Sequence, residues 1–157
     1  MPRLCLAVFI FACVTTNPIA AAENPAIEFL KPPGLLNVPS FSQVTTARGG
    51  KLVFVSGQVA WDEKGKPLFP GDLEAQTRRT YENVKLALAA AGATFDDVVK
   101  FTVYVKNLDT AKWKLVSKVR SEFLSKERAP ASTMIGVTGL VFEELLIEIE
   151  AYAVVKE

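Results

Sequence analysis

The sequence contains no histidine, which removes the side chain that most often serves as a general base or proton switch near neutral pH. Its only cysteines, Cys5 and Cys13, both lie among the first 22 residues. If that segment is removed, the remaining chain has no thiol nucleophile, no disulfide and no thiolate metal site. These absences exclude histidine-based triads and the usual His or Cys metal centres, so we expect neither a metal nor a cofactor.

The chain begins with the three parts of a secretory signal peptide. A basic residue, Arg3, is followed by an uncharged apolar run over residues 4–14, and small residues at 20–22 precede Glu23. The apolar run is shorter than the roughly 20 residues that a membrane-spanning helix needs. We predict that residues 1–22 are a signal peptide, that the mature protein is periplasmic or secreted, and that it has no membrane anchor.

Positive and negative charges are nearly equal in number: the chain has 18 Lys and Arg and 17 Asp and Glu, which gives a formal net charge of +1. Loss of residues 1–22 removes only Arg3 from this count and leaves the mature chain formally neutral. A neutral chain has no net attraction to nucleic acid or anionic lipid, and no basic stripe with interleaved aromatic residues is visible. We therefore expect no nucleic-acid partner. The 135 residues that remain of 157 fit one domain.

The first part of the mature chain is rich in proline. Residues 23–39 contain four prolines, which predicts an extended leader, with the folded domain spanning residues 40–157. Two strand-like runs follow, at residues 41–47 and 52–60, with Gly49 and Gly50 between them. Because paired glycines accept the positive φ of a tight turn, these runs predict an antiparallel hairpin.

Two helices and three further strands are predicted in the rest of the chain. Asp72 is the expected N-cap of a helix that runs to about Ala91, and Asp109 is the expected N-cap of a second helix that runs to about Ser125. Between them lies a strand with one apolar side, made of Val99, Phe101, Val103 and Val105. Strands at residues 129–140 and 145–155, joined by a turn, end the chain. This order predicts an α+β fold, a single mixed sheet with two helices on one face.

Two carboxylates interrupt the last, strongly apolar strand. Glu148 and Glu150 are two residues apart and therefore share one face of that strand. An unpaired carboxylate is costly to bury, so one interpretation is a sheet face open to solvent. The other is a carboxylate that lines a cavity.

Four ordered motifs connect the chain to a known family: Val55–Gln58 (Val-Ser-Gly-Gln), Glu82–Lys85 (Glu-Asn-Val-Lys), Pro130–Thr133 (Pro-Ala-Ser-Thr) and Ile147–Ala151 (Ile-Glu-Ile-Glu-Ala). With these motifs the chain resembles the Rid family of reactive intermediate deaminases, the YjgF or L-PSP type, from about Phe41 to Val155. The resemblance implies a chorismate-mutase-like fold assembled as a homotrimer, with small-molecule clefts between subunits. One position departs from the pattern, because Ser132 stands where the family has an arginine.

The resemblance also implies a set of site residues. In the arginine-bearing branch of the family, an enamine or imine is hydrolysed to a keto acid and ammonia, and the arginine holds the substrate carboxylate with its planar fork. Glu148 matches the glutamate that orients the attacking water and is the expected catalytic residue. The expected ligand-binding residues of the cleft are Phe41, Ser56, Gly57, Gln58, Ser117, Ser132 and Met134. On packing grounds alone, Ser56 and Gly57 also suit a place where another element approaches closely.

The serine at position 132 leaves three functions open. A hydroxyl cannot form a two-pronged ionic contact, and a charged hydrogen bond contributes about 1.5–3 kcal/mol, so imines with a carboxylate should bind more weakly. Lys51, Lys126 and Arg128 are other cations of the chain, but no pattern places them at the site. The first hypothesis is a Rid-like protein that binds a small neutral or weakly polar molecule, with or without hydrolysis. The second is ordinary imine or enamine deamination, and the third is a non-catalytic, holdase-like binding protein of the cell envelope.

Overall fold

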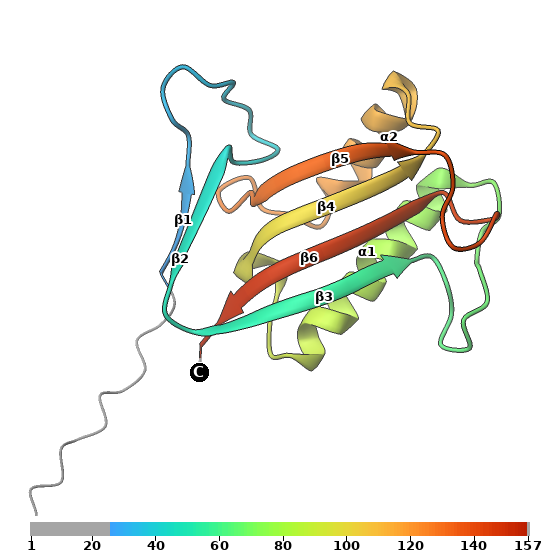
Figure 1. Ribbon diagram of the computed structural model, residues 1–157, viewed down its shortest axis with the longest axis horizontal. Helices are drawn as coiled ribbons and strands as arrows, with labels where there is room; N and C mark the ends of the chain where they lie inside the picture. Colours follow the sequence, from blue (N-terminus) through green and yellow to red (C-terminus); the bar gives the residue numbers. More distant parts are fainter. Residues whose placement is uncertain (1–25, 157) are drawn as a thin grey trace, which may run out of the picture.

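The computed structural model describes residues 26–156, in which two helices cover one face of a four-stranded mixed sheet (Figure 1). The predicted α+β fold is thereby confirmed, whereas the predicted signal peptide lies outside the described residues. The elements are β1 (Ala26–Leu30), β2 (Val44–Arg48), β3 (Lys51–Val59), α1 (Leu73–Ala90), the 3₁₀ turn η1 (Phe95–Asp97), β4 (Val98–Lys106), α2 (Thr110–Arg120), β5 (Ala131–Val137) and β6 (Ile147–Val155). No helix in this part of the chain is long and apolar enough to cross a bilayer.

The four-stranded sheet has the order β3-β6-β4-β5. β6 runs antiparallel to both β3 and β4, whereas β4 and β5 are parallel, so the sheet is mixed as predicted. The last two strands of the chain are not neighbours, because β4 lies between them. β6 is the more buried of the two, and its alternate residues from Ile147 to Val155 enter the core beneath the helices. We call the side of the sheet covered by α1 and α2 the helix face and the other side the open face.

The predicted hairpin between residues 41–47 and 52–60 is wrong. β2 pairs with β1 in a separate two-stranded antiparallel sheet, and β3 pairs with β6. Gly49 and Gly50 both adopt positive φ, but they turn the chain out of the sheet instead of folding β2 back on β3. Figure 1 shows β1 and β2 standing beside the end of the sheet, where the Thr45 hydroxyl donates to the Val99 carbonyl oxygen at 2.6 Å. β1 therefore lies inside the segment predicted as an extended leader.

The core-facing row of β4 differs from the prediction at one position. Phe101, Val103 and Val105 are fully buried as expected, but the fourth core residue is Val98 and not Val99. The register between β4 and β6 shifts between Val98 and Lys100, so a bulge changes the alternation there. The alternation of apolar residues does not reveal this bulge, because Val98 and Val99 are both apolar and either could continue the core-facing row.

Helix α1 has the predicted ends. The Asp72 carboxylate accepts a hydrogen bond from the Ala75 amide at 2.9 Å, and Gly92 follows the helix at a φ of +77°. Thr77, Tyr81, Val84 and Leu88 form its buried stripe. Helix α2 begins after Asp109 as predicted but ends at Arg120 instead of near Ser125, and its last turn is followed by tighter turns.

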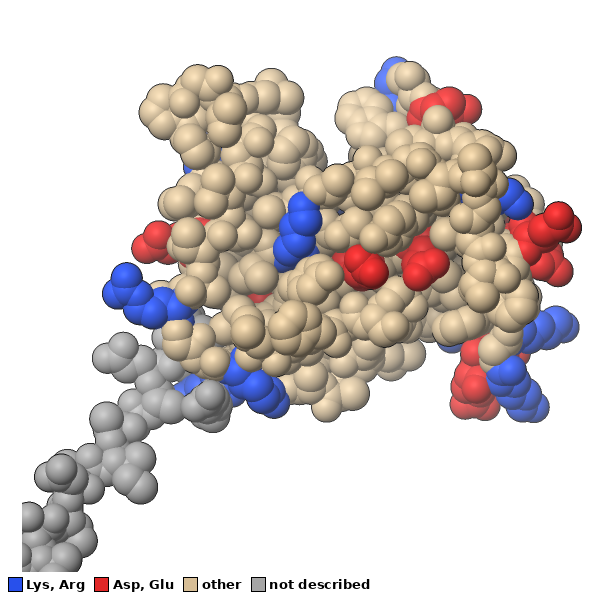
Figure 2. All heavy atoms as spheres, in the orientation of Figure 1, with Lys and Arg blue, Asp and Glu red and all other residues tan. Residues whose placement is uncertain are grey.

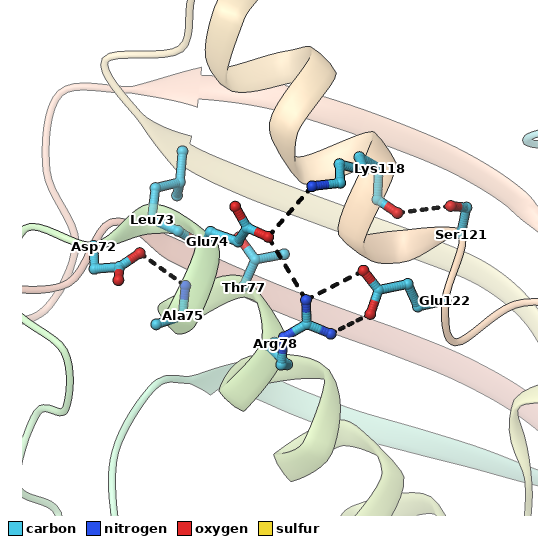
Figure 3. A network of polar contacts seen from close by, with 9 residues as sticks. All are labelled: Asp72, Leu73, Glu74, Ala75, Thr77, Arg78, Lys118, Ser121 and Glu122. Carbon is cyan, nitrogen blue, oxygen red and sulfur yellow. Dashed lines mark hydrogen bonds and ion pairs between the residues drawn. The ribbon is translucent and has the colours of Figure 1, made fainter.

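A network of charged side chains ties α2 to α1 on the outside of the molecule (Figure 3). Arg78 of α1 forms a forked contact with Glu122, which follows α2, and Glu74 lies 3.6 Å from Lys118 of α2. Each exposed pair contributes little by itself, but several together fix one geometry better than a single pair does. The network therefore holds the C-terminal end of α2, which carries Arg120, in one position over the sheet.

Candidate functional site

The sequence-predicted site residues form two separate groups in the structure. The first group lines a cavity of about 880 Å³ beside α2 and β5, and its predicted members are Phe41, Ser117, Ser132 and Met134. We call this space the α2 cavity. The second group lies where β3 and β6 pair, and its members are Ser56, Gly57, Gln58 and Glu148. We call it the Glu148 group.

The register of the sheet places the two groups on opposite faces. Residues that pair directly across neighbouring strands point to the same side of a sheet. Ser132 pairs with Phe101, which is buried in the core under the helices, so Ser132 lies on the helix face. Glu148 pairs with Tyr104, one of the alternate residues of β4 that point away from that core, so Glu148 lies on the open face. One chain by itself therefore does not bring Glu148 and Ser132 into a single pocket.

Gly57 lies directly against the Glu148 carboxylate. A Cβ atom at Gly57 would lie 1.9 Å from Glu148 Oε1 and 2.8 Å from its Cδ. The register of β3 against β6 shifts between Val55 and Gln58, and this bulge brings the Gly57 backbone to the carboxylate. Gly57 therefore meets both expectations: another element approaches it closely, and that element carries Glu148, the expected catalytic residue. The Gln58 amide group donates to the Ser56 carbonyl oxygen at 3.1 Å, which keeps the bulge compact.

Partial burial raises the pKa of Glu148, and the neighbouring charge of Glu150 raises it further. Glu150 has a hydrogen-bond donor of its own, because the Tyr104 hydroxyl donates to its Oε2 at 3.2 Å. A carboxylate with a raised pKa exchanges protons nearer to neutral pH than an ordinary glutamate does. This environment suits Glu148 to act first as a base and then as an acid.

The open face around Glu148 is mostly uncharged. Figure 2 looks onto this face and shows acidic side chains over the middle of the sheet, with one basic side chain beside them and uncharged atoms elsewhere around them. Several large apolar side chains are exposed on or beside the sheet, namely Leu52 (64% exposed), Phe54 (70%), Ile135 (39%) and Tyr152 (37%). The Phe54 and Tyr152 rings meet edge to face, 5.7 Å apart. Apolar side chains gathered in this way are typical of surfaces that bind another molecule.

The α2 cavity contains an arginine that the sequence interpretation did not consider. Arg120, the last residue of α2, is only 7% exposed, and its Nη1 donates to the Ser132 hydroxyl oxygen at 3.1 Å. It follows Val116 by one helical turn and therefore belongs to the buried stripe of α2. A charged residue on the core-facing side of an amphipathic helix is the signal that could have identified it.

The three cations weighed from the sequence lie elsewhere or at the margin of the cavity. Lys126 lines the α2 cavity as an exposed side chain. The Lys51 amine donates to the Ala91 carbonyl oxygen at 3.4 Å, and Arg128 donates to the Asp96 carbonyl oxygen at 2.9 Å from Nη2. Within residues 26–156, no cluster of three or more His, Cys, Asp or Glu side chains could hold a metal ion.

Comparison with known proteins gives consistent matches. A model of the family described as Endoribonuclease L-PSP matches residues 35–155. A RutC family protein of Pyrococcus abyssi is 41% identical over 105 residues, which cover 66% of this chain and 79% of that protein. The RutC family protein YjgH of Escherichia coli is 36% identical over 104 residues, covering 66% of this chain and 77% of that protein.

Solved structures match the fold as well. The conserved Rid family protein YyfB of Yersinia pestis superimposes with a TM-score of 0.76 at 36% identity, covering 82% of this chain and 98% of that one. The YjgF gene product of Escherichia coli matches with a TM-score of 0.57 at 36% identity, covering 67% of this chain and 81% of that one. Sequence and structure thus point to the same group of proteins.

Proposed function

Because the chain belongs to the Rid/YjgF family, whose model is described as Endoribonuclease L-PSP, we propose that it binds a small imine or enamine in clefts between copies of itself and hydrolyses it. The observation that carries this proposal is the contact between Glu148 and Gly57. It holds a half-buried carboxylate with a raised pKa at a defined place on the open face. Such a group can both remove a proton from water and return one to a leaving amine.

The cleft in this proposal is completed by a second copy of the chain. Glu148 and the α2 cavity lie on opposite faces, so contact between them joins one patch of a copy to a different patch of the next. Contacts of that kind are heterologous, and they generate closed rings when the rotation permits. We propose a homotrimer in which the open face of each copy packs beside the α2 cavity of the next, which would also cover Phe54 and Tyr152.

The hydrolysis can be written around Glu148 alone. Its carboxylate takes a proton from water as the water oxygen attacks the carbon of a protonated imine, and the C=N electron pair moves to nitrogen. The resulting carbinolamine then receives the proton from Glu148 on its nitrogen. The C–N bond breaks with its electron pair moving to nitrogen, the carbonyl forms from the hydroxyl oxygen, and the hydroxyl proton passes to the departing ammonia, which leaves as ammonium. One water is consumed for each carbonyl and each ammonium ion produced, and Glu148 returns to its starting state.

Two other functions are less well supported. An endoribonuclease activity would need groups that bind and cleave a phosphodiester, but the chain has no histidine and the open face carries Glu148 and Glu150 near its centre, which repel phosphate. A binding role without turnover would not require the raised pKa of Glu148. The imine assay distinguishes this role from hydrolysis.

The proposal is tested with imines made in place by an amino-acid oxidase. Formation of the keto acid and ammonia should be faster with the purified protein than with buffer, in the range typical of enzymes, about 1–1000 per second. A matched preparation that has been heat-denatured controls for base catalysis by the protein surface. Binding of the imine or its product without any increase in rate would favour the non-catalytic role.

We also propose that residues 1–22 are cleaved during export, on the basis of the basic, apolar and small-residue segments at the start of the chain. Intact-mass measurement of protein from the envelope fraction of the host should give an N-terminus at or within a few residues of Glu23. Recovery of the uncleaved chain from the cytoplasm would contradict this part of the proposal.

A further inference from the structure

Arg120 is a buried cation without a counter-charge. Its side chain is 7% exposed, and no carboxylate in residues 26–156 lies within ion-pair distance of its guanidinium. Nη1 donates to the Ser132 hydroxyl, whereas Nε and Nη2 are buried and have no hydrogen-bond partner. A buried guanidinium with two unused donors is costly, because the lost hydration is not replaced. Such a group calls for a partner that the folded chain itself does not supply.

The surroundings of Arg120 hold it in place without neutralising it. Its guanidinium carbon lies 5.9 Å from the centre of the Phe101 ring. The Tyr81 hydroxyl nearby is buried and also has no partner, and burial raises the pKa of Tyr81 to about 12, so it stays neutral. Burial lowers the pKa of Arg120, but an arginine remains protonated at neutral pH. The positive charge is therefore permanent, and its nearest neighbours are aromatic rings and hydroxyl groups.

Ser132 connects this charge to the α2 cavity. Its hydroxyl oxygen accepts the hydrogen bond from Arg120, so its own proton is free to be donated to a group in the cavity. Both residues line the cavity, together with Ser117 of α2. A hydroxyl that accepts from a cation is a stronger donor than an ordinary serine, because the hydrogen bonds polarise one another.

We infer that Arg120 and Ser132 together form a binding site for a carboxylate group of the ligand, with the cation supplied by helix α2 instead of strand β5. The inference rests on the proposed function for the imine character of the ligand, but not for its charge. A monoanion balances the single guanidinium, whereas a phosphate dianion would leave excess negative charge in a cavity that Asp109 also lines. The first hypothesis from the sequence was a neutral or weakly polar ligand, because Ser132 carries no charge. On this inference the ligand is instead an anion, and Arg120 of helix α2 supplies the charge that the family's arginine supplies from strand β5.

The test compares two probes that differ only in charge, pyruvate and ethyl pyruvate, by calorimetry at low ionic strength. The unmodified protein should bind pyruvate about 10- to 100-fold more tightly than the ester, the range expected for a charged hydrogen bond. Arg120→Met, which replaces the guanidinium with an apolar side chain, should remove this preference. Arg120→Lys should retain part of it, because the charge stays and the fork is lost.

Three further variants keep the inference testable if Arg120→Met folds poorly. Ser132→Ala removes the connecting hydroxyl alone and should also weaken pyruvate binding relative to the ester. Lys114→Met removes an exposed cation of the same helix that is not part of the network between α1 and α2, and it should leave the preference unchanged. Ser132→Arg combined with Arg120→Met puts the cation back on β5 and should restore the preference.

Equal binding of pyruvate and its ester by the unmodified protein, or an unchanged preference in Arg120→Met, would overturn the inference. Tighter binding of inorganic phosphate than of pyruvate would overturn the assignment of a carboxylate. These outcomes are separate from the proposed function. A carboxylate preference without imine hydrolysis would contradict the hydrolysis alone, and hydrolysis without the preference would contradict the inference alone.

Discussion

Replacement of Glu148 by glutamine should lower the rate of imine hydrolysis by about 10²- to 10⁴-fold, the range that a positioned general acid–base group contributes. The amide keeps the size of the side chain and its place against Gly57, but it can neither accept a proton from water nor return one to the amine. The measurement is the formation of keto acid and ammonia from imines made in place by an amino-acid oxidase. Binding of pyruvate should change little, because Arg120 and Ser132 are untouched.

The pH dependence of the rate gives a second test of Glu148. Its carboxylate must be ionised to accept the proton of water, so the rate should fall as the pH drops through the Glu148 pKa. Because burial and Glu150 raise that pKa, the acid limb should lie above the ordinary glutamate range. Glu150→Gln removes one of the two causes and should move the acid limb to lower pH without abolishing the rate. An acid limb that does not respond to Glu150→Gln would assign the titration to another group.

Gly57→Ala should reduce the rate of hydrolysis by at least about 10²-fold, since displacements of about 1 Å have effects of this size. The added Cβ would lie 1.9 Å from Glu148 Oε1, so the carboxylate has to leave its present position. The measurement is the same imine assay, with circular dichroism and a thermal melt to show that the chain still folds.

Gly139→Ala is the matched control for this variant. A Cβ at Gly139 would meet no atom within 4 Å, so the rate should be unchanged. In a Glu148→Gln background, Gly57→Ala should add little further loss, because both changes act on the same carboxylate. A Gly57→Ala protein with an unaltered rate would show that the contact between Gly57 and Glu148 does not position the catalytic group.

The sequence was sufficient to predict the parts of the fold that depend on local patterns. Asp72, Gly92 and Asp109 mark helix ends because capping and positive φ need particular side chains, and these residues lie where expected. The failures come from non-local choices. Gly49 and Gly50 permit a hairpin, but pairing of β3 with β6 is what decides the path of the chain. Residues 41–60 by themselves do not show that β3 pairs with β6 instead of with β2.

The sequence motifs named single residues of the candidate site, but they did not give the arrangement of those residues in space. Motif matches identified Glu148 and Ser132, yet only the register of the sheet shows that they lie on opposite faces. The role of Ser132 was interpreted from the serine alone, as the loss of a charge. Arg120 changes that interpretation, because it reaches Ser132 from helix α2, and a motif on one strand carries no information about its neighbours in space.

The central claim is that one copy of the chain completes the site of another, and mixing two inactive variants tests it most directly. Glu148→Gln inactivates the Glu148 group, and Ser117→Trp fills the α2 cavity, so each variant alone should be inactive. In a refolded equal mixture, about a quarter of the clefts of a ring should combine an intact Glu148 group with an intact α2 cavity. The account therefore predicts that hydrolysis returns to about a quarter of the unmodified rate at random pairing. A mixture no more active than its separate components would contradict a site shared between copies.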